Sequence, residues 1–456
     1  MQADLFKHLN KQQKEAVSSV EGPSIILAGA GSGKTRVLIF KVLNLVVKHH
    51  ISPHSIVMIT FTNKAANEMK QRIRAYEPFP RQDKQASLGY VGTFHSFCNV
   101  ILRKNGDRIG IDLHYVIYDD DDQKDLMKSI LKKMNIRKFT PSYYLNRISE
   151  VYQNYQRELE KNNALDFDDL IMRTVELFSQ DKQVLEKYQE KYPYLLVDEF
   201  QDTNYAQYVF TKLLSQKHRN IAVVGDFSQS IYSWRGADIR NLEKFKEDFP
   251  EAKIFHLERN YRSTQKILDF AYDVISKNQT HPILNLFTDN THGEDIRFYQ
   301  ASNEEDEAIF VARELEKHKS EIPYNECAIL YRINAQSRVL EETFLHFGIP
   351  YMLIGGIRFY ERKEIKDILS YLRLLINPLD EVSRDRIEKL GKKRWELFKK
   401  VQETYTKENN LSTVDLMEML FKTTYYLDLY NPDDPEDYSR LENIKELKSV
   451  ALNFPD

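Results

Sequence analysis

A glycine-rich run that ends in a lysine and a threonine is the clearest candidate for chemistry in this chain. It reads Ala28-Gly29-Ala30-Gly31-Ser32-Gly33-Lys34-Thr35, between the apolar residues 24–27 and 37–40. This pattern predicts a buried strand, a tight turn and a helix start, so that backbone N–H groups and Lys34 hold a phosphate and Thr35 holds Mg²⁺. Ala28 stands where the pattern usually has glycine. A purely structural turn is the alternative interpretation.

An acidic pair follows another apolar stretch. Residues 194–197 are Tyr-Leu-Leu-Val, and Asp198 and Glu199 come directly after them. On a chain with a phosphate loop, Asp198 is expected to hold the hydration shell of Mg²⁺, and Glu199 to accept a proton from the attacking water or to orient it. Such a pair also occurs as ordinary surface chemistry.

Three further apolar stretches end in hydroxyl, amide and aromatic side chains. They cover residues 55–61, 90–97 and 221–226. In an open parallel sheet such residues gather at the carboxyl edge, where ligands bind, and they suit nucleic-acid backbone and bases. The residues concerned are Phe61, Asn63, His95, Gln229, Trp234 and Arg235. The alternative places Phe61 and Trp234 in the core.

Two more positions match the recognition of a nucleotide. Gln13, in a helix that Asn10 is expected to cap, has the donor and acceptor that an adenine edge requires, although a solvent-facing glutamine is the commoner case. Tyr261 is expected to stack on a purine. Arg262 is expected to reach the terminal phosphate as an arginine finger.

Composition indicates a soluble, multidomain protein. The 456 residues are 42% hydrophobic and 29% charged, with a net charge of −3, which argues against a uniformly basic surface. The chain has no long apolar run and no leader pattern at its start, so we expect a cytoplasmic protein that does not enter membranes. Cys98 and Cys327 are too isolated for a disulfide or zinc site and are expected to be buried.

The remaining pattern divides the chain. Residues 105–163 are expected to form a helical insertion without strands, and the acidic run 119–122 to begin a helix. Further on, strands are expected at 296–299, 327–331 and 351–354, alternating with helices near 304–319 and 335–347. Beyond residue 378 the chain is expected to be helical.

In order along the chain, these motifs resemble the UvrD/PcrA/Rep-type superfamily 1A DNA helicases. They are LNKQQKEAV, AGAGSGKT, ITFTNKAA, GTFHSFC, ALDFDDL, LLVDEFQDT, VVGDFSQSIYSWRGA, NYRST, LYRINAQSR and GGIRFYERKEIKD. The resemblance implies an α/β fold of two RecA-like parallel-sheet P-loop NTPase domains with helical insertions. Expected domains are 1–104 with 164–253 (1A), 105–163 (1B), 254–378 (2A, partial) and 379–456 (2B, partial).

The resemblance also implies residue roles. Gln13 and Tyr261 would bind adenine, and residues 28–36, including Arg36, would surround the phosphates. Lys34, Asp198, Glu199, Gln229 and Arg262 would carry catalysis, with Thr35 and Asp198 on Mg²⁺. The DNA contacts would be Phe61, Asn63, His95, Trp234 and Arg235.

By the same resemblance the activity is ATP-dependent 3′-to-5′ movement on single-stranded DNA and at duplex junctions. The protein would act in repair or replication, together with proteins of those pathways. It would be a monomer or a weak dimer. The family's Thr-x-His-x-x-Lys-Gly-Leu-Glu-Phe and Gly-x-Thr-Arg-Ala motifs are absent from these residues. Two alternatives therefore stay open: a truncated ATP- and DNA-binding remnant with little turnover, or the N-terminal part of a helicase-nuclease.

Overall fold

The structure is a computed structural model that describes residues 6–76, 88–134, 150–291, 293–332, 336–353, 362–405, 411–432 and 435–452. It divides into two compact units, Met1–Ile296 and Arg297–Asp456. Each unit is described by itself. None of the described helices is long and apolar enough to cross a membrane.

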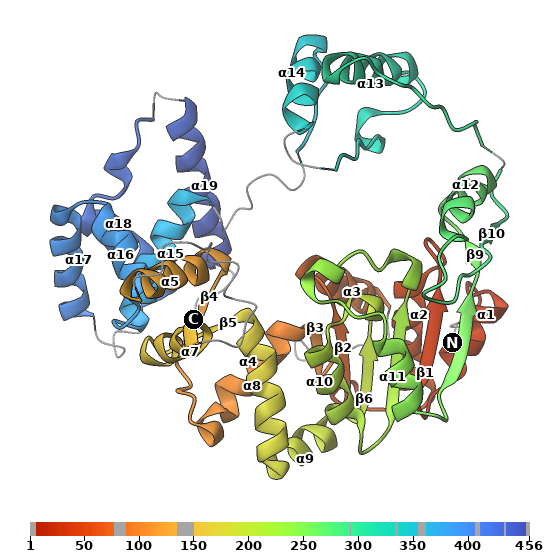
Figure 1. The fold of residues 1–456 in the computed structure, drawn as a ribbon, viewed down its shortest axis with the longest axis horizontal. Helices are drawn as coiled ribbons and strands as arrows, with labels where there is room; N and C mark the ends of the chain where they lie inside the picture. Colours follow the sequence, from red (N-terminus) through yellow and green to blue (C-terminus); the bar gives the residue numbers. More distant parts are fainter. Residues whose placement is uncertain are drawn as a thin grey trace. The chain divides into compact units, whose positions relative to one another are not determined.

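A six-stranded parallel sheet forms the centre of the first unit (Figure 1). Its strands, in spatial order, are β3 (Tyr90–Thr93), β2 (Ile56–Thr60), β6 (Tyr194–Val197), β7 (Asn220–Gly225), β1 (Ser24–Ala28) and β8 (Lys253–Leu257). Every neighbouring pair in it is parallel. The carboxyl ends of all six strands therefore meet at one edge of the sheet.

Helices cover both faces of this sheet, because its four central strands, β2, β6, β7 and β1, are apolar and buried on both sides. In β1, Ile25 and Leu27 pack into one core and Ile26 and Ala28 into the other. The helices of the unit are α1 (Lys11–Ser18), α2 (Lys34–Leu43), α3 (Asn63–Ala75), α4 (Phe94–Asn105), α5 (Asp120–Lys133), α7 (Glu150–Lys161), α8 (Phe167–Gln180), α9 (Lys182–Lys191), α10 (Tyr205–Ser215), α11 (Asn241–Asp248) and α12 (Gln265–Ile275). The expected α/β class is confirmed.

Several expected helix starts are confirmed by their caps. Asn10 caps α1, as expected, with a reciprocal hydrogen bond to Gln13. Asp119 caps α5, so the acidic run 119–122 is a helix start, as expected. No group of histidine, cysteine and acidic residues in the described part of the chain is arranged to bind a metal on its own.

The expectation of an insertion without strands is wrong for residues 105–163. A short strand, β4 (Val116–Tyr118), pairs in parallel with β5 (Ala164–Asp166). Val116 and Tyr118 are buried, and three residues of extended chain are too few for a periodicity signal. A second small pair joins β9 (Arg259–Asn260) to β10 (Phe287–Thr288).

In the second unit, every regular element among the described residues is a helix. Two short 3-10 helices in this described part join the α-helices, which are α13 (Glu304–His318), α14 (Ser337–Phe347), α15 (Lys363–Ile376), α16 (Glu381–Lys389), α17 (Lys392–Thr404), α18 (Thr413–Thr424) and α19 (Pro435–Leu452). The last five share one core, which includes Tyr371, Phe398 and Tyr426. The expected helices near 304–319 and 335–347, and beyond residue 378, are confirmed.

The three strands expected in this region are not formed at their described residues, 296–299, 327–331 and 351–353. A strand requires a hydrogen-bonded partner, and these segments are assigned to no ladder. Phe298 is 91% exposed and Leu330 is 94% exposed. Residue 354 and parts of the 330–338 and 355–367 motifs lie outside the described residues.

Candidate functional site

The glycine-rich run forms a turn between β1 and α2. Gly31 and Gly33 have φ angles of 66° and 90°, which favour glycine over any residue with a Cβ. The Ser32 hydroxyl donates to the Gly29 carbonyl at 2.7 Å and tightens the turn. Ala28 is the last residue of β1, in extended backbone where a Cβ fits, which explains the departure from glycine. Lys34 is the first residue of the helix, so the turn has the geometry of an anion site.

The acidic pair lies at the end of β6 and faces this turn. Lys34 Nζ is 3.6 Å from Glu199 Oε2. Glu199 has a φ of 50°, a left-handed backbone conformation that is uncommon for a residue with a Cβ. Two residues far apart in sequence are thereby brought together as expected.

Asp198 has the properties of a candidate metal ligand. Burial raises its pKa to about 7, with a smaller effect from the neighbouring Glu199. Its Oδ1 atom and Oδ1 of Asp202 are buried and have no hydrogen-bond partner among the described residues. A bound divalent cation would satisfy such oxygen atoms, so the donor set fits Mg²⁺.

Gln13 and Tyr261 lie around the same turn. Gln13 is 1% exposed and donates to the Ser32 carbonyl at 2.9 Å, so the solvent-facing alternative is wrong. Asn10, which caps the same helix, donates to the Tyr261 hydroxyl at 2.8 Å. The two residues expected to hold adenine are thus linked through one asparagine.

Asn260 is a site residue that our sequence reasoning missed. Its side chain is buried, donates to the Ala30 carbonyl at 2.6 Å and accepts from the N–H groups of Arg262 and Ser263 at 2.8 and 2.7 Å. Tyr261 N–H adds a bond to the Gly31 carbonyl at 2.9 Å. Arg262 is therefore held next to the phosphate loop. An asparagine that turns the next two residues is a signal that could have been found.

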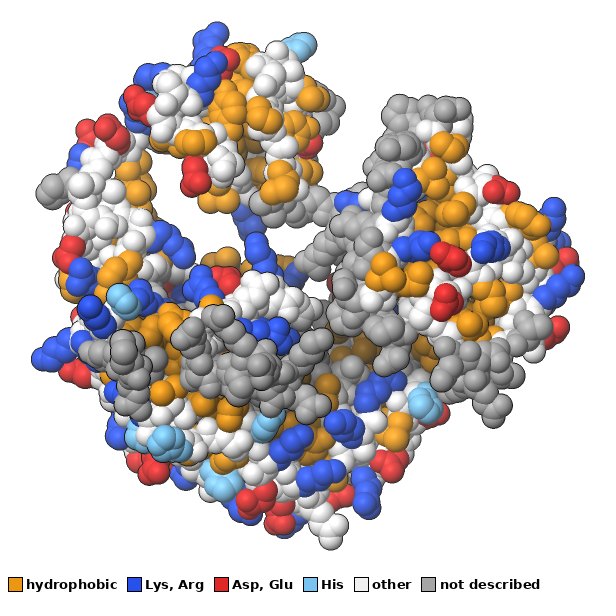
Figure 2. All heavy atoms as spheres, turned by 180° about the vertical axis from the view of Figure 1, so that it is seen from behind, with side chains coloured by type: hydrophobic (Ala, Val, Ile, Leu, Met, Phe, Trp, Pro, Cys, Tyr) orange, Lys and Arg blue, Asp and Glu red, His pale blue; other side chains and the backbone are white. Residues whose placement is uncertain are grey.

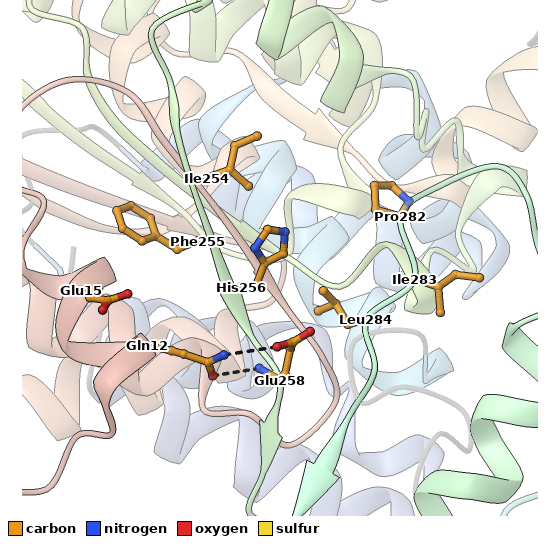
Figure 3. Close-up of a pocket in the computed structure, with 9 residues that line it drawn as sticks. All are labelled: Gln12, Glu15, Ile254, Phe255, His256, Glu258, Pro282, Ile283 and Leu284. Carbon is orange, nitrogen blue, oxygen red and sulfur yellow. Dashed lines mark hydrogen bonds between the residues drawn. The ribbon is translucent and has the colours of Figure 1, made fainter.

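The first helix also holds this segment from the other side (Figure 3). Gln12 donates to Glu258 Oε2 at 3.3 Å and accepts from the Glu258 N–H at 3.4 Å. Both residues line a pocket of about 420 Å³ between α1, β8 and residues 282–284. Helix α1 therefore fixes the chain just before Asn260.

An aromatic strip, partly exposed at Phe61 and Tyr232 and exposed at Trp234, lies on the loops after β2 and β7. We define it as Phe61, Tyr232 and Trp234, with Arg235. The Phe61 and Tyr232 rings stack with centroids 5.6 Å apart, and Tyr232 lies 6.4 Å from Trp234. Arg235 covers the Trp234 ring at 4.5 Å. Trp234 is 72% exposed, so the core alternative is wrong for it.

His95 and Asn63, the other residues expected to contact DNA, are not members of the aromatic strip. His95 lies edge-on to Phe167 with centroids 5.6 Å apart, and burial lowers the pKa of His95. Asn63 is exposed at the start of α3. Our sequence reasoning did not single out Tyr232 or the exposed Phe167, although Tyr232 lies in the same quoted motif as Trp234.

Gln229 also lies at this sheet edge. Its amide donates to Asp226 Oδ2 at 2.8 Å, and its side chain is exposed. Burial raises the pKa of Asp226, while Lys34 opposes this effect. Charge on the face drawn in Figure 2 is mixed, with basic and acidic side chains interspersed, in keeping with the net charge of −3.

Family models match the parts of the chain that form this site. The model of the UvrD/REP helicase N-terminal domain matches residues 9–144 and 139–250. The chain belongs to the UvrD/REP helicase family. The model of the UvrD-like helicase C-terminal domain matches residues 255–451, which extends the family's match over the second unit.

Sequence similarity to individual proteins supports the same family. The ATP-dependent DNA helicase PcrA of Staphylococcus aureus (strain Mu50 / ATCC 700699) is 43% identical, over 99% of this chain and 71% of the relative. The protein of the same name from Staphylococcus epidermidis (strain ATCC 12228 / FDA PCI 1200) is 47% identical, over 91% of this chain and 60% of the relative.

Proposed function

We propose that this chain is an ATP-dependent DNA helicase or translocase that moves 3′-to-5′ on single-stranded DNA. The observation that carries the proposal is the 3.6 Å approach of Lys34 to Glu199, at the same sheet edge as the aromatic strip. A phosphate site and a base-stacking surface on one sheet suit coupling of hydrolysis to movement. The direction rests on the family resemblance alone.

The nucleotide is proposed to bind around the glycine turn. The backbone of residues 29–33 and the start of α2 would hold the phosphates, with Lys34 on the terminal ones and Arg36 nearby. Gln13 would exchange its bond to Ser32 for the adenine edge. Tyr261 would stack on the base, and Arg262, next to Gly31, would neutralise charge on the leaving phosphates.

Hydrolysis is proposed to use the acidic pair. Thr35 and Asp198 would hold Mg²⁺, which when bound neutralises phosphate charge and favours attack. Glu199 takes the proton of the attacking water, while Lys34 moves from Glu199 to the phosphate and frees the carboxylate to act as base. Gln229 is proposed to contact the terminal phosphate and to report its loss to the strip.

Single-stranded DNA is proposed to lie on the aromatic strip. Trp234 and Phe61 would stack on bases, because stacking tolerates any sequence. Arg235, Asn63 and His95 would contact the strand beside them, Arg235 through its phosphates. We also propose that the protein acts at duplex junctions, together with proteins of repair or replication, because its relatives are named as DNA helicases. Its proposed location is the cytoplasm.

The test compares ATP hydrolysis with and without single-stranded DNA for the wild type, Glu199→Gln and the control Glu190→Gln. Glu190 is a surface acid paired with Lys217. We expect DNA to stimulate the wild type and the control, and Glu199→Gln to lose at least about 100-fold in kcat while it still binds ATP. Wild-type binding of ATP and DNA without turnover would reject the helicase and favour a remnant.

A further inference from the structure

One buried glutamine connects the end of β6 to the end of β7. Gln201 is 2% exposed, and its amide donates to Glu199 Oε2 at 2.9 Å and to Asp202 Oδ2 at 3.3 Å. Its side-chain oxygen, Oε1, accepts from the Asp226 N–H at 3.0 Å. A Cβ at Gly225 would lie 2.8 Å from Gln201 Oε1, so a larger residue there would displace this oxygen.

On the first side, Gln201 is a neutral partner of the proposed base. Glu199 Oε2 is shared between this amide and Lys34. Once Lys34 turns to a phosphate, the amide is the donor that still fixes the carboxylate. A neutral donor orients a base without the strong stabilisation of its charged form that a cation gives.

On the second side, Gln201 holds the loop that leads to the aromatic strip. Asp226 accepts from the Gln229 amide at 2.8 Å and from the Ser228 N–H at 3.1 Å. The Ser230 hydroxyl donates to the backbone carbonyl of Gln201 at 3.3 Å. The same chain segment then continues to Trp234. Both ends of the loop's first turn are thus tied to one residue.

We propose that Gln201 is a positioning residue that orients Glu199 and couples its position to the loop carrying Trp234. This inference rests on the proposed function, because it assigns to Gln201 the connection between the site of ATP hydrolysis and the DNA-binding loop. It differs from Gln229 in being buried and in bonding to the carboxylate of Glu199 itself.

The test uses two variants of the full chain. Gln201→Glu keeps the acceptor for Asp226 but points a carboxylate oxygen at Glu199, and Gln201→Met removes both groups at similar length. The control is Gln189→Met, at another buried glutamine, which donates to the Leu213 carbonyl at 2.7 Å. We expect kcat for DNA-stimulated ATP hydrolysis to fall at least about tenfold in both variants, with KM for ATP changed less than about threefold.

A double-variant comparison separates orientation from damage. In a Glu199→Gln background, Gln201→Met should cause little further loss, because the residue acts through Glu199. An equal loss in both backgrounds, or kcat within about twofold of the Gln189→Met control, would overturn the proposal.

A fluorescence measurement tests the coupling without turnover. With Trp395→Phe, Trp234 is the only tryptophan of the chain. A non-hydrolysable ATP analogue should change its emission in that protein, and the change should disappear with Gln201→Met although the analogue still binds. If the analogue changes the Trp234 emission equally with and without Gln201→Met, the proposed coupling is rejected. A wild type that binds the analogue and DNA but never hydrolyses ATP instead rejects the proposed function.

Discussion

The side-chain amide of Asn260 and the carbonyl of Ala30 are joined by a hydrogen bond of 2.6 Å, which attaches the segment of Tyr261 and Arg262 to the phosphate loop. Because Asn260 also accepts from the Arg262 and Ser263 N–H groups, one side chain sets both the turn and its anchor. The position of Arg262 thus depends directly on the shape of the phosphate loop.

Replacement of Asn260 should therefore impair hydrolysis. In Asn260→Asp the acceptor remains, but a carboxylate oxygen faces the Ala30 carbonyl, and we expect kcat/KM for ATP to fall roughly 10- to 100-fold. The matched control is Asn290→Asp, at an exposed asparagine that donates to the Ser263 carbonyl at 3.0 Å. Steady-state ATPase assays check this, and equal effects of the two variants would contradict it.

Gly33 offers a test of the phosphate loop. Its φ is 90°, and a Cβ there would lie 2.9 Å from the Gln13 amide nitrogen. Gly33→Ala should lower the free energy of unfolding by about 1–2 kcal/mol and weaken ATP binding at least about tenfold. Gly22→Ala is the control, because Gly22 has a φ of 79° and nothing within 4 Å.

The two glycine variants are compared by thermal unfolding and by titration with a fluorescent ATP analogue. Both should lose stability, since both place a Cβ on left-handed backbone. Only Gly33→Ala should lose nucleotide affinity. Similar affinities for the two variants would argue against the proposed contact between this loop and the phosphates.

Trp234 should supply much of the affinity for single-stranded DNA. Trp234→Ala is expected to weaken binding by roughly 1–3 kcal/mol, as removal of a stacking platform does. Tyr205→Ala serves as the control, because Tyr205 is 58% exposed and carries Lys244 over its ring, as Trp234 carries Arg235. Fluorescence anisotropy of a labelled oligonucleotide measures both, and equal losses would reject the strip as the binding surface.

Lys41 predicts a pH dependence of stability. It donates to the carbonyls of Ala16 and Ser19, and burial lowers its pKa from 10.5 to about 7, with a smaller effect of Lys253. Between these values the unfolded chain binds more protons than the folded one, so the lysine's contribution to stability increases as pH rises.

The measurement compares wild type with Lys41→Met by urea unfolding. The stability difference should shift in favour of wild type by on the order of 2 kcal/mol between about pH 7 and about pH 9.5. Lys124→Met, at a surface lysine paired with Asp121, should show no such trend. A difference that stays flat with pH would show that Lys41 titrates near its ordinary pKa in the folded protein.

The two cysteines should differ in reactivity. Burial raises the pKa of Cys98 to about 12, and its side chain is 0% exposed. Cys327 is only partly buried, so the expectation that both are buried is wrong for it. A thiol reagent should modify one cysteine in the native protein and a second only after unfolding. Cys327→Ser should abolish the fast reaction, and rapid labelling of that variant would contradict the packing of Cys98.

The sequence predicted the parallel sheet and its edge well, because both depend on local patterns. Apolar runs of strand length and the glycine turn identify β1, β2, β6 and β7, and polar residues at their ends identify the site. The segments around Phe298 and Leu330 have the same local pattern, yet they form no described strand. Pairing depends on distant partners, which a local pattern does not contain.

The contacts of the site were harder to predict. Gln201 and Asn260 have no reactive group, and their importance comes from what lies opposite them in space, the Asp226 N–H and the Ala30 carbonyl. Gln13 looked like surface for the same reason. Its burial comes from the Ser32 carbonyl, which a helix pattern cannot reveal.

The left-handed backbone at Glu199 makes stability and activity compete at a single position. A residue with a Cβ in this conformation costs about 1 kcal/mol. The ion pair with Lys34 offsets little of this cost, because its 3.6 Å separation is too long for a hydrogen bond. Glycine or asparagine would relieve the strain there. Selection of this chain for thermal stability alone is therefore expected to enrich substitutions of Glu199, its proposed general base. A screen for more stable variants must therefore also select for ATPase activity.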